Sequence, residues 1–108
     1  MPIPTTDPIV NIPVVTPFNE SDEVDHDAIG ANVERWCTTA ATGFLVGSQS
    51  GEEWTLSEDE KLAVAASVKA ALTGERFLMG GIDCPSAAET LSRAEAFAEA
   101  GAEVVRIR

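Results

Sequence analysis

Residues 43–58 read GFLVGSQSGEEWTLSE and predict a short strand, a loop of small residues and the start of a helix. Phe44–Val46 is a continuous apolar run, typical of a strand that is covered on both faces of a parallel sheet. In α/β proteins, ligands bind beyond the carboxyl ends of such strands. The loop offers hydroxyls and backbone amides there, which makes it a candidate site for a small anion. A plain βα connection has the same pattern, and the stretch alone leaves both interpretations open.

The alternation of strands and helices continues on both sides of this stretch. Predicted strands lie at Ile9–Thr16, 44–46, 77–81 and Glu103–Ile107. A first helix is predicted from about Asp25 to Ala41, and two more begin at the capping-box patterns Ser57–Glu60 and Ser86–Glu89. The resulting βαβαβαβ order predicts parallel strands joined by right-handed crossovers, with helices packed on the sheet.

Each predicted helix carries one apolar stripe that should face the sheet. The first stripe holds Ile29, Val33, Trp36, Cys37 and Ala40. The second holds Leu62, Ala65, Val68 and Leu72, and the third holds Leu91, Ala94 and Ala98. Gly74 and Gly101 follow the second and third stripes, where glycine commonly ends a helix.

The spacing of the strands favours a barrel over an open dinucleotide-binding sheet. Each βα unit takes roughly 26 to 35 residues, as in a barrel of about 250 residues built from eight units. A Rossmann-type sheet would need a GxGxxG loop after the first strand, which here ends in Thr16-Pro17-Phe18. We therefore predict an α/β fold, the amino-terminal half of a (β/α)8 TIM barrel. Residues 1–108 would form a single partial domain of about three and a half βα units.

Composition excludes several classes of partner. The 108 residues include 44% hydrophobic residues and carry a formal net charge of −11, from 18 acidic and 7 basic side chains. Nucleic acids and anionic membranes both require a basic surface, so neither is an expected partner. Apolar runs stay far below the ~18 residues of a membrane span, and Met1–Pro4 lacks the features of a secretory signal. We expect a cytoplasmic protein.

Cysteine and histidine residues do not indicate a metal site or a nucleophile. Cys37 and Cys84 have no CxxC or Cys/His spacing, and reduced thiols are expected. Cys37 falls on an apolar helix face, where a cysteine usually acts as a small hydrophobe. His26 is the only histidine and lies among aspartates at a helix start, which predicts a solvated side chain.

Four motifs are distributed along nearly the whole chain. They are Val15-Thr16-Pro17-Phe18, Ser48-Gln49-Ser50-Gly51-Glu52, Thr55-Leu56-Ser57 with Glu60, and Ala100-Gly101-Ala102. Together they resemble the dihydrodipicolinate synthase/N-acetylneuraminate lyase family. The resemblance implies a (βα)8 barrel, commonly tetrameric when full length, with class I aldolase chemistry in which pyruvate or a related 2-oxo acid forms a Schiff base with a lysine. It implies no metal and no dissociable organic cofactor.

The resemblance assigns substrate binding to Gln49, Ser50 and Gly51. The family loop usually reads Gly-Thr-Thr-Gly-Glu or Gly-Ser-Thr-Gly-Glu and holds the carboxylate of the 2-oxo acid. Ser50 stands at the second hydroxyl position, whereas Gln49 replaces a threonine that passes protons in the synthases. Because a carboxamide cannot replace that hydroxyl, cleavage or condensation of hydroxylated 2-oxo acids fits better than dihydrodipicolinate synthesis. Glu52 is expected to be structural.

The family's Schiff-base lysine and its tyrosine lie on later strands, so no catalytic residue is expected within this chain. The sequence has no tyrosine, and its two lysines, Lys61 and Lys69, are expected to face solvent from a helix. The chain alone should therefore be inactive, as a fragment of a 2-oxo-acid-dependent lyase. The alternative is a short, non-catalytic protein of the same fold that binds a carboxylate or assembles with other chains.

Overall fold

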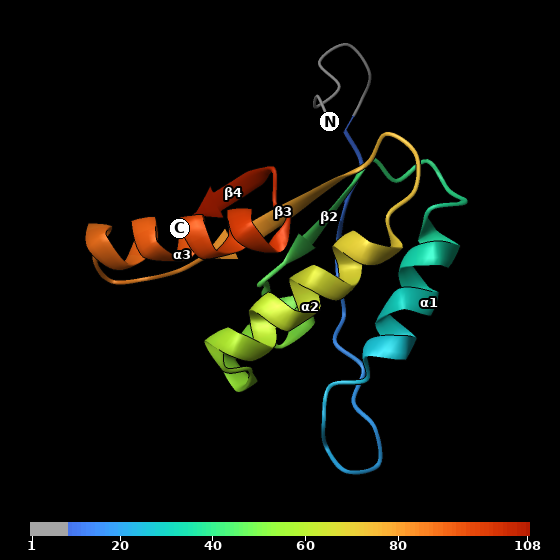
Figure 1. Ribbon diagram of the computed structural model, residues 1–108, viewed down its shortest axis with the longest axis horizontal. Helices are drawn as coiled ribbons and strands as arrows, with labels where there is room; N and C mark the ends of the chain where they lie inside the picture. Colours follow the sequence, from blue (N-terminus) through green and yellow to red (C-terminus); the bar gives the residue numbers. More distant parts are fainter. Residues whose placement is uncertain (1–8) are drawn as a thin grey trace.

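The computed structural model describes residues 9–108, and Met1–Pro4 lie outside them. Four parallel strands form one sheet in the order β1-β2-β3-β4. The strands are β1 (Asn11–Pro13), β2 (Gly43–Val46), β3 (Phe77–Ile82) and β4 (Val104–Ile107). The helices are α1 (His26–Trp36), α2 (Glu58–Ala71) and α3 (Ala87–Ala100), with two short 3₁₀ turns, η1 (Gln49–Gly51) and η2 (Glu53–Thr55). This order confirms the predicted βαβαβαβ pattern (Figure 1).

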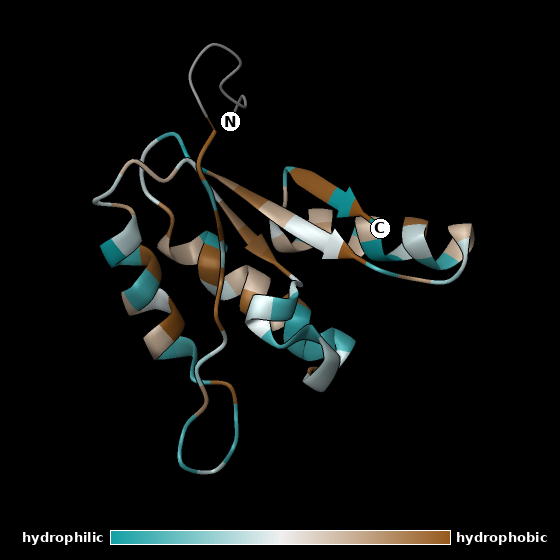
Figure 2. Ribbon diagram, turned by 180° about the vertical axis from the view of Figure 1, so that it is seen from behind, coloured by the Kyte–Doolittle hydropathy of each residue, from teal (hydrophilic) through white to brown (hydrophobic). Residues whose placement is uncertain are grey.

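All three helices lie against one face of the sheet, with α2 in contact with both α1 and α3 (Figure 1). Ile12, Phe44 and Leu78 lie side by side in register and point into the core beneath these helices. Because side chains alternate along a strand, the neighbours Leu45 and Met79 point to the opposite face, which we call the inner face. Figure 2, seen from the opposite side, shows the mostly apolar strands in front of helices that carry both apolar and polar residues.

Two elements are shorter than the sequence predicts. β1 covers Asn11–Pro13 rather than Ile9–Thr16. At its start, the Val10 amide donates to the Thr42 hydroxyl (2.8 Å) instead of joining the ladder. α1 ends at Trp36 rather than near Ala41. The hydroxyls of Thr38 and Thr39 donate to main-chain carbonyls three residues earlier, a competition with helical bonding that favours termination.

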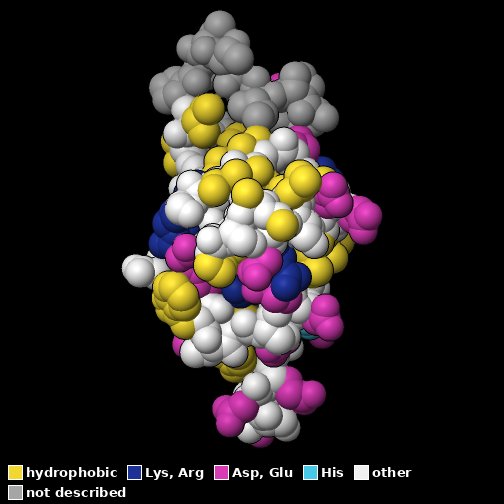
Figure 3. Space-filling model, turned by 90° about the vertical axis from the view of Figure 1, so that its left-hand side faces the viewer, with side chains coloured by type: hydrophobic (Ala, Val, Ile, Leu, Met, Phe, Trp, Pro, Cys, Tyr) yellow, Lys and Arg dark blue, Asp and Glu magenta, His cyan; other side chains and the backbone are white. Residues whose placement is uncertain are grey.

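The predicted stripes agree with the buried faces of α1 and α2, except that Ala40 lies beyond the end of α1 and is exposed, and the stripe of α3 agrees less well. Ile29 and Val33 are buried on α1, and Ala65 and Val68 on α2. On α3 the predicted stripe was wrong at Leu91, which is 62% exposed, and at Ala98, which is also exposed, while Phe97 is buried. The Phe97 ring occupies the space above Gly80, where no side chain competes for it. Figure 3, viewed from the side that carries α3 and β4, shows hydrophobic side chains among charged ones on this surface.

The start of α2 provides a direct test of local sequence effects. The Ser57 hydroxyl accepts from the Glu60 amide (3.1 Å), and the Glu60 carboxylate accepts from the Ser57 amide (2.8 Å), which completes the predicted capping box. Ser57→Ala is expected to lower the free energy of unfolding by about 1 kcal/mol, because orphan amides of the first turn lose their acceptor. Urea unfolding measures the change, with Ser92→Ala on exposed α3 surface as the control. Equal stability of the two variants would contradict a role for the box.

Candidate functional site at the carboxyl ends of the strands

The loop that follows β2 lies at the carboxyl edge of the sheet. It leaves the strand through Gly47, whose φ of +90° is a left-handed conformation that favours glycine. A side chain on Gly47 would also come within 2.7 Å of the Gly81 carbonyl oxygen on β3. The backbones of Gly47 and Gly81 can therefore approach closely only because neither residue has a Cβ.

Hydrogen bonds fix the middle of this loop against the end of β1. The Thr16 hydroxyl donates to the Gly51 carbonyl (2.6 Å), and the Gly51 amide donates to the carbonyl (3.1 Å) and hydroxyl (3.3 Å) of Ser48. Thr16 and Ser48 are both buried. A Cβ on Gly51 would lie 2.6 Å from the Val14 carbonyl oxygen, so the loop sits directly on the backbone that follows β1. The turn at residues 49–51 is thus held in one position.

The structure places the three predicted binding residues together but in different environments. Gln49 and Ser50 are exposed, and within residues 9–108 their side chains make no hydrogen bonds. Gly51 is buried behind them, and its amide and carbonyl are already used within the protein. The groups of this turn that remain available to a ligand therefore belong to Gln49 and Ser50.

Beyond the turn, an ion-pair network with one buried member, Glu53, joins three strand ends. Glu53, on η2, is only 5% exposed and pairs with Arg108, which follows β4. Arg108 also lies 3.2 Å from the carboxylate of Asp83, which follows β3. Sequence reasoning missed Glu53 and Arg108 because 55 positions separate them and no local pattern links the two. The network ties the loop after β2 to β3 and β4.

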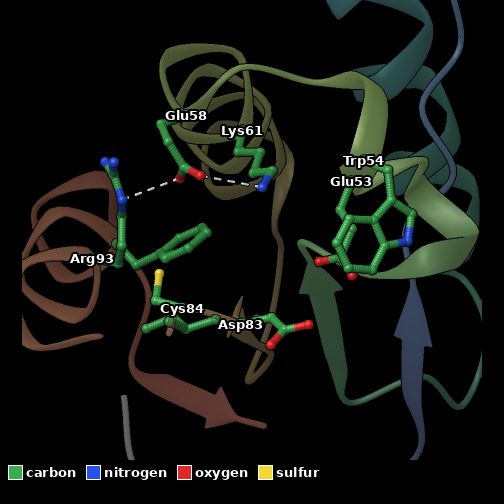
Figure 4. A pocket seen from close by; sticks show the side chains of 10 residues that line it. Glu53, Trp54, Glu58, Lys61, Asp83, Cys84 and Arg93 are labelled. Atoms are coloured by element: carbon green, nitrogen blue, oxygen red, sulfur yellow. Dashed lines mark hydrogen bonds and ion pairs between the residues drawn. The ribbon is translucent and has the colours of Figure 1, made fainter. Parts of the chain in front are cut away.

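A pocket opens between α2, α3 and the end of β3, beside this network (Figure 4). Glu58 lies between two cations there, 3.3 Å from Lys61 and 3.4 Å from Arg93. The Lys61 side chain is only 17% exposed, less than the sequence predicts, but its ammonium is paired with a carboxylate. Cys84 also lines this pocket as a free thiol.

The other candidate residues have ordinary surface roles. Lys69 pairs with Glu103 at 2.8 Å. His26 is exposed, as expected, and its Nδ1 lies 2.7 Å from the Ser67 hydroxyl on α2. Cys37 is partly buried against the core. Across residues 9–108 no group of three histidine, cysteine or acidic residues could hold a metal ion, and none of the helices in that range is long and apolar enough to cross a membrane.

Comparisons with known proteins agree on one family. The model of the dihydrodipicolinate synthetase family matches residues 9–107. The chain is 27% identical over 86 residues to a 4-hydroxy-tetrahydrodipicolinate synthase from Leuconostoc citreum, covering 80% of this chain and 30% of that protein. It is 29% identical over 92 residues to an N-acetylneuraminate lyase from Rhizobium meliloti, covering 85% and 31%.

The fold also matches solved structures. A dihydrodipicolinate synthase family protein from Coccidioides immitis superimposes with a TM-score of 0.85 at 22% identity, over 93% of this chain and 33% of that one. The chain thus spans about a third of the length of the proteins it matches. Its strands and helices correspond to the amino-terminal part of their TIM barrels, which confirms the predicted fold class.

Proposed function

This chain belongs to the dihydrodipicolinate synthetase family, and from that premise we propose that it contributes the amino-terminal half of the active site of a 2-oxo-acid-dependent lyase. Residues 1–108 would be part of one barrel domain in the cytoplasm, and the full-length protein would form a tetramer. The Schiff-base lysine would come from a later strand, since Lys61 and Lys69 are both held in ion pairs. The substrate would be pyruvate or a related 2-oxo acid.

One observation carries this proposal, namely the exposed hydroxyl of Ser50 on a turn held at the carboxyl edge of the sheet. A hydroxyl and neighbouring amides can hold a carboxylate, and each such charge-assisted hydrogen bond is worth roughly 1.5–3 kcal/mol. The carboxylate would be bound at the turn, while the adjacent ketone carbon condenses with the lysine amine and loses water. Gln49 beside it cannot relay a proton as a threonine hydroxyl would. Cleavage or condensation of hydroxylated 2-oxo acids is therefore the favoured reaction.

The test is reductive trapping with pyruvate on the protein isolated from its native source. Borohydride should convert the imine into a stable adduct, visible as added mass on a lysine outside residues 1–108. An unmodified protein would contradict the lyase and leave the short, carboxylate-binding protein as the function to examine. No metal or organic cofactor is needed for this chemistry.

Ser50→Ala is expected to weaken pyruvate binding about tenfold, because it removes one hydrogen bond to a charged acceptor. The pyruvate concentration that gives half-maximal trapping should rise by that factor. Ser92→Ala, which removes an exposed hydroxyl on α3, serves as the control and should leave that concentration unchanged. Unchanged trapping in Ser50→Ala would remove Ser50 from the site.

A further inference from the structure

A partly buried arginine, Arg106, lies on the inner face of the sheet. It pairs in register with Gly81, while its neighbour Val105 packs into the core on the helix side. Its Nη2 donates to the Gly47 carbonyl at 3.4 Å, and a Cβ on Gly81 would come within 3.0 Å of the same nitrogen. The guanidinium therefore lies across Gly81 and beside Gly47, at the foot of the loop that carries Ser50.

Within the described part of the chain, Arg106 has no acidic partner, although the protein has 18 acidic residues. Its Nε is buried and makes no hydrogen bond, and the long bond to Gly47 is the one hydrogen bond that its Nη groups make to residues 9–108. Arg93 and Arg108, by contrast, pair with carboxylates of neighbouring elements. A guanidinium has five donors in a planar fork that matches a carboxylate. Such a charge, partly buried and unpaired within the described residues, costs stability, and an anion bound at this position would offset that cost.

The position of Arg106 distinguishes its ligand from the carboxylate held at Ser50. Ser50 lies on the exposed turn, whereas Arg106 lies within the strand, level with the last residues of β3. A ligand in contact with both must extend from the turn down onto the inner face. One acidic group would then meet the turn, and another acidic group would meet the arginine.

We propose that Arg106 binds a second carboxylate of the substrate, so that this site selects 2-oxo acids carrying two acidic groups. The inference rests on the proposed function, because it takes the first carboxylate to be held at Ser50. Arg106 acts here as a specificity-determining residue. Its fork would donate two parallel hydrogen bonds to the distal carboxylate, and a substrate without that group would leave the charge unpaired.

The test compares 2-oxoglutarate with pyruvate in the protein produced from its own gene. Calorimetric titration measures both dissociation constants in the unchanged protein, in Arg106→Met and in Arg35→Met. Arg35 is an exposed arginine in the last turn of α1, so its loss changes net charge equally, away from the inner face. Arg106→Met should raise the Kd for 2-oxoglutarate about tenfold more than the Kd for pyruvate. Arg35→Met should leave the ratio of the two constants unchanged.

Three results would overturn the inference. The first is an equal change in both constants on Arg106→Met, and the second is failure of the unchanged protein to bind 2-oxoglutarate. The third is a lower melting temperature of ligand-free Arg106→Met, which would indicate a structural partner, whereas removal of an unpaired charge should leave the melting temperature equal or higher. Borohydride trapping with pyruvate separates the two proposals. If pyruvate forms an adduct but Arg106→Met does not change the preference for 2-oxoglutarate, only the role of Arg106 is rejected. If that preference changes but no adduct forms, only the lyase is rejected.

Discussion

Phe44→Ala is expected to lower the free energy of unfolding by about 4 kcal/mol, because large core side chains lose both their burial and their packing when truncated. Phe44 is fully buried in the centre of β2, in register with Ile12 and Leu78. Its ring also stacks on Trp36 of α1, with centroids 6.0 Å apart. Removing the ring would leave a cavity between the sheet and α1.

Urea unfolding of the purified chain measures the effect, and Trp54→Ala is the matched control. Trp54 is a larger aromatic residue but is 69% exposed on η2, so its replacement should change stability by less than about 0.5 kcal/mol. A loss of similar size in both variants would show that the core is not organised around Phe44.

Gly81→Ala should destabilise the protein by about 3 kcal/mol, although it adds a single methyl group. The new Cβ would overlap the carbonyl oxygen of Gly47, which belongs to the backbone and cannot turn aside as a side chain can. The end of β2 and the loop behind it would have to move. We therefore also expect weaker binding of the proposed 2-oxo acid ligand in this variant, since the turn that carries Ser50 begins two residues after Gly47.

Gly30→Ala provides the control for this substitution. Gly30 lies inside α1, and a Cβ built there meets nothing within 4 Å. Alanine should be neutral or raise stability by up to about 1 kcal/mol, since it is the better helix former. Thermal or urea unfolding of both variants decides the matter. A Gly81→Ala protein as stable as Gly30→Ala would mean that the contact between Gly47 and Gly81 does not constrain the loop.

The site was only partly predictable from the chain, and the reasons differ by residue. The loop after β2 was located because small residues follow an apolar strand, a signal contained in adjacent positions, and the family resemblance then singled out Gln49, Ser50 and Gly51. The hydrogen bond from Thr16 to Gly51 could not be predicted from neighbouring positions, since 35 residues separate the two. Arg106 resembles any charged residue in an apolar run, and only its register with Gly81 sets it beside Gly47.

By itself, the sequence determined the order of strands and helices, the capped start of α2 and the position of the loop after β2. These features depend on hydrogen bonds and apolar periodicity among residues that are close together in the sequence. Tertiary structure alone decided that Phe97 rather than Leu91 is buried, and that Glu53 meets Arg108. It also left Arg106 without a carboxylate partner in the described residues. Such outcomes depend on which side chains from distant elements fill the same space and which charged groups meet. Those contacts exist only once the sheet has formed.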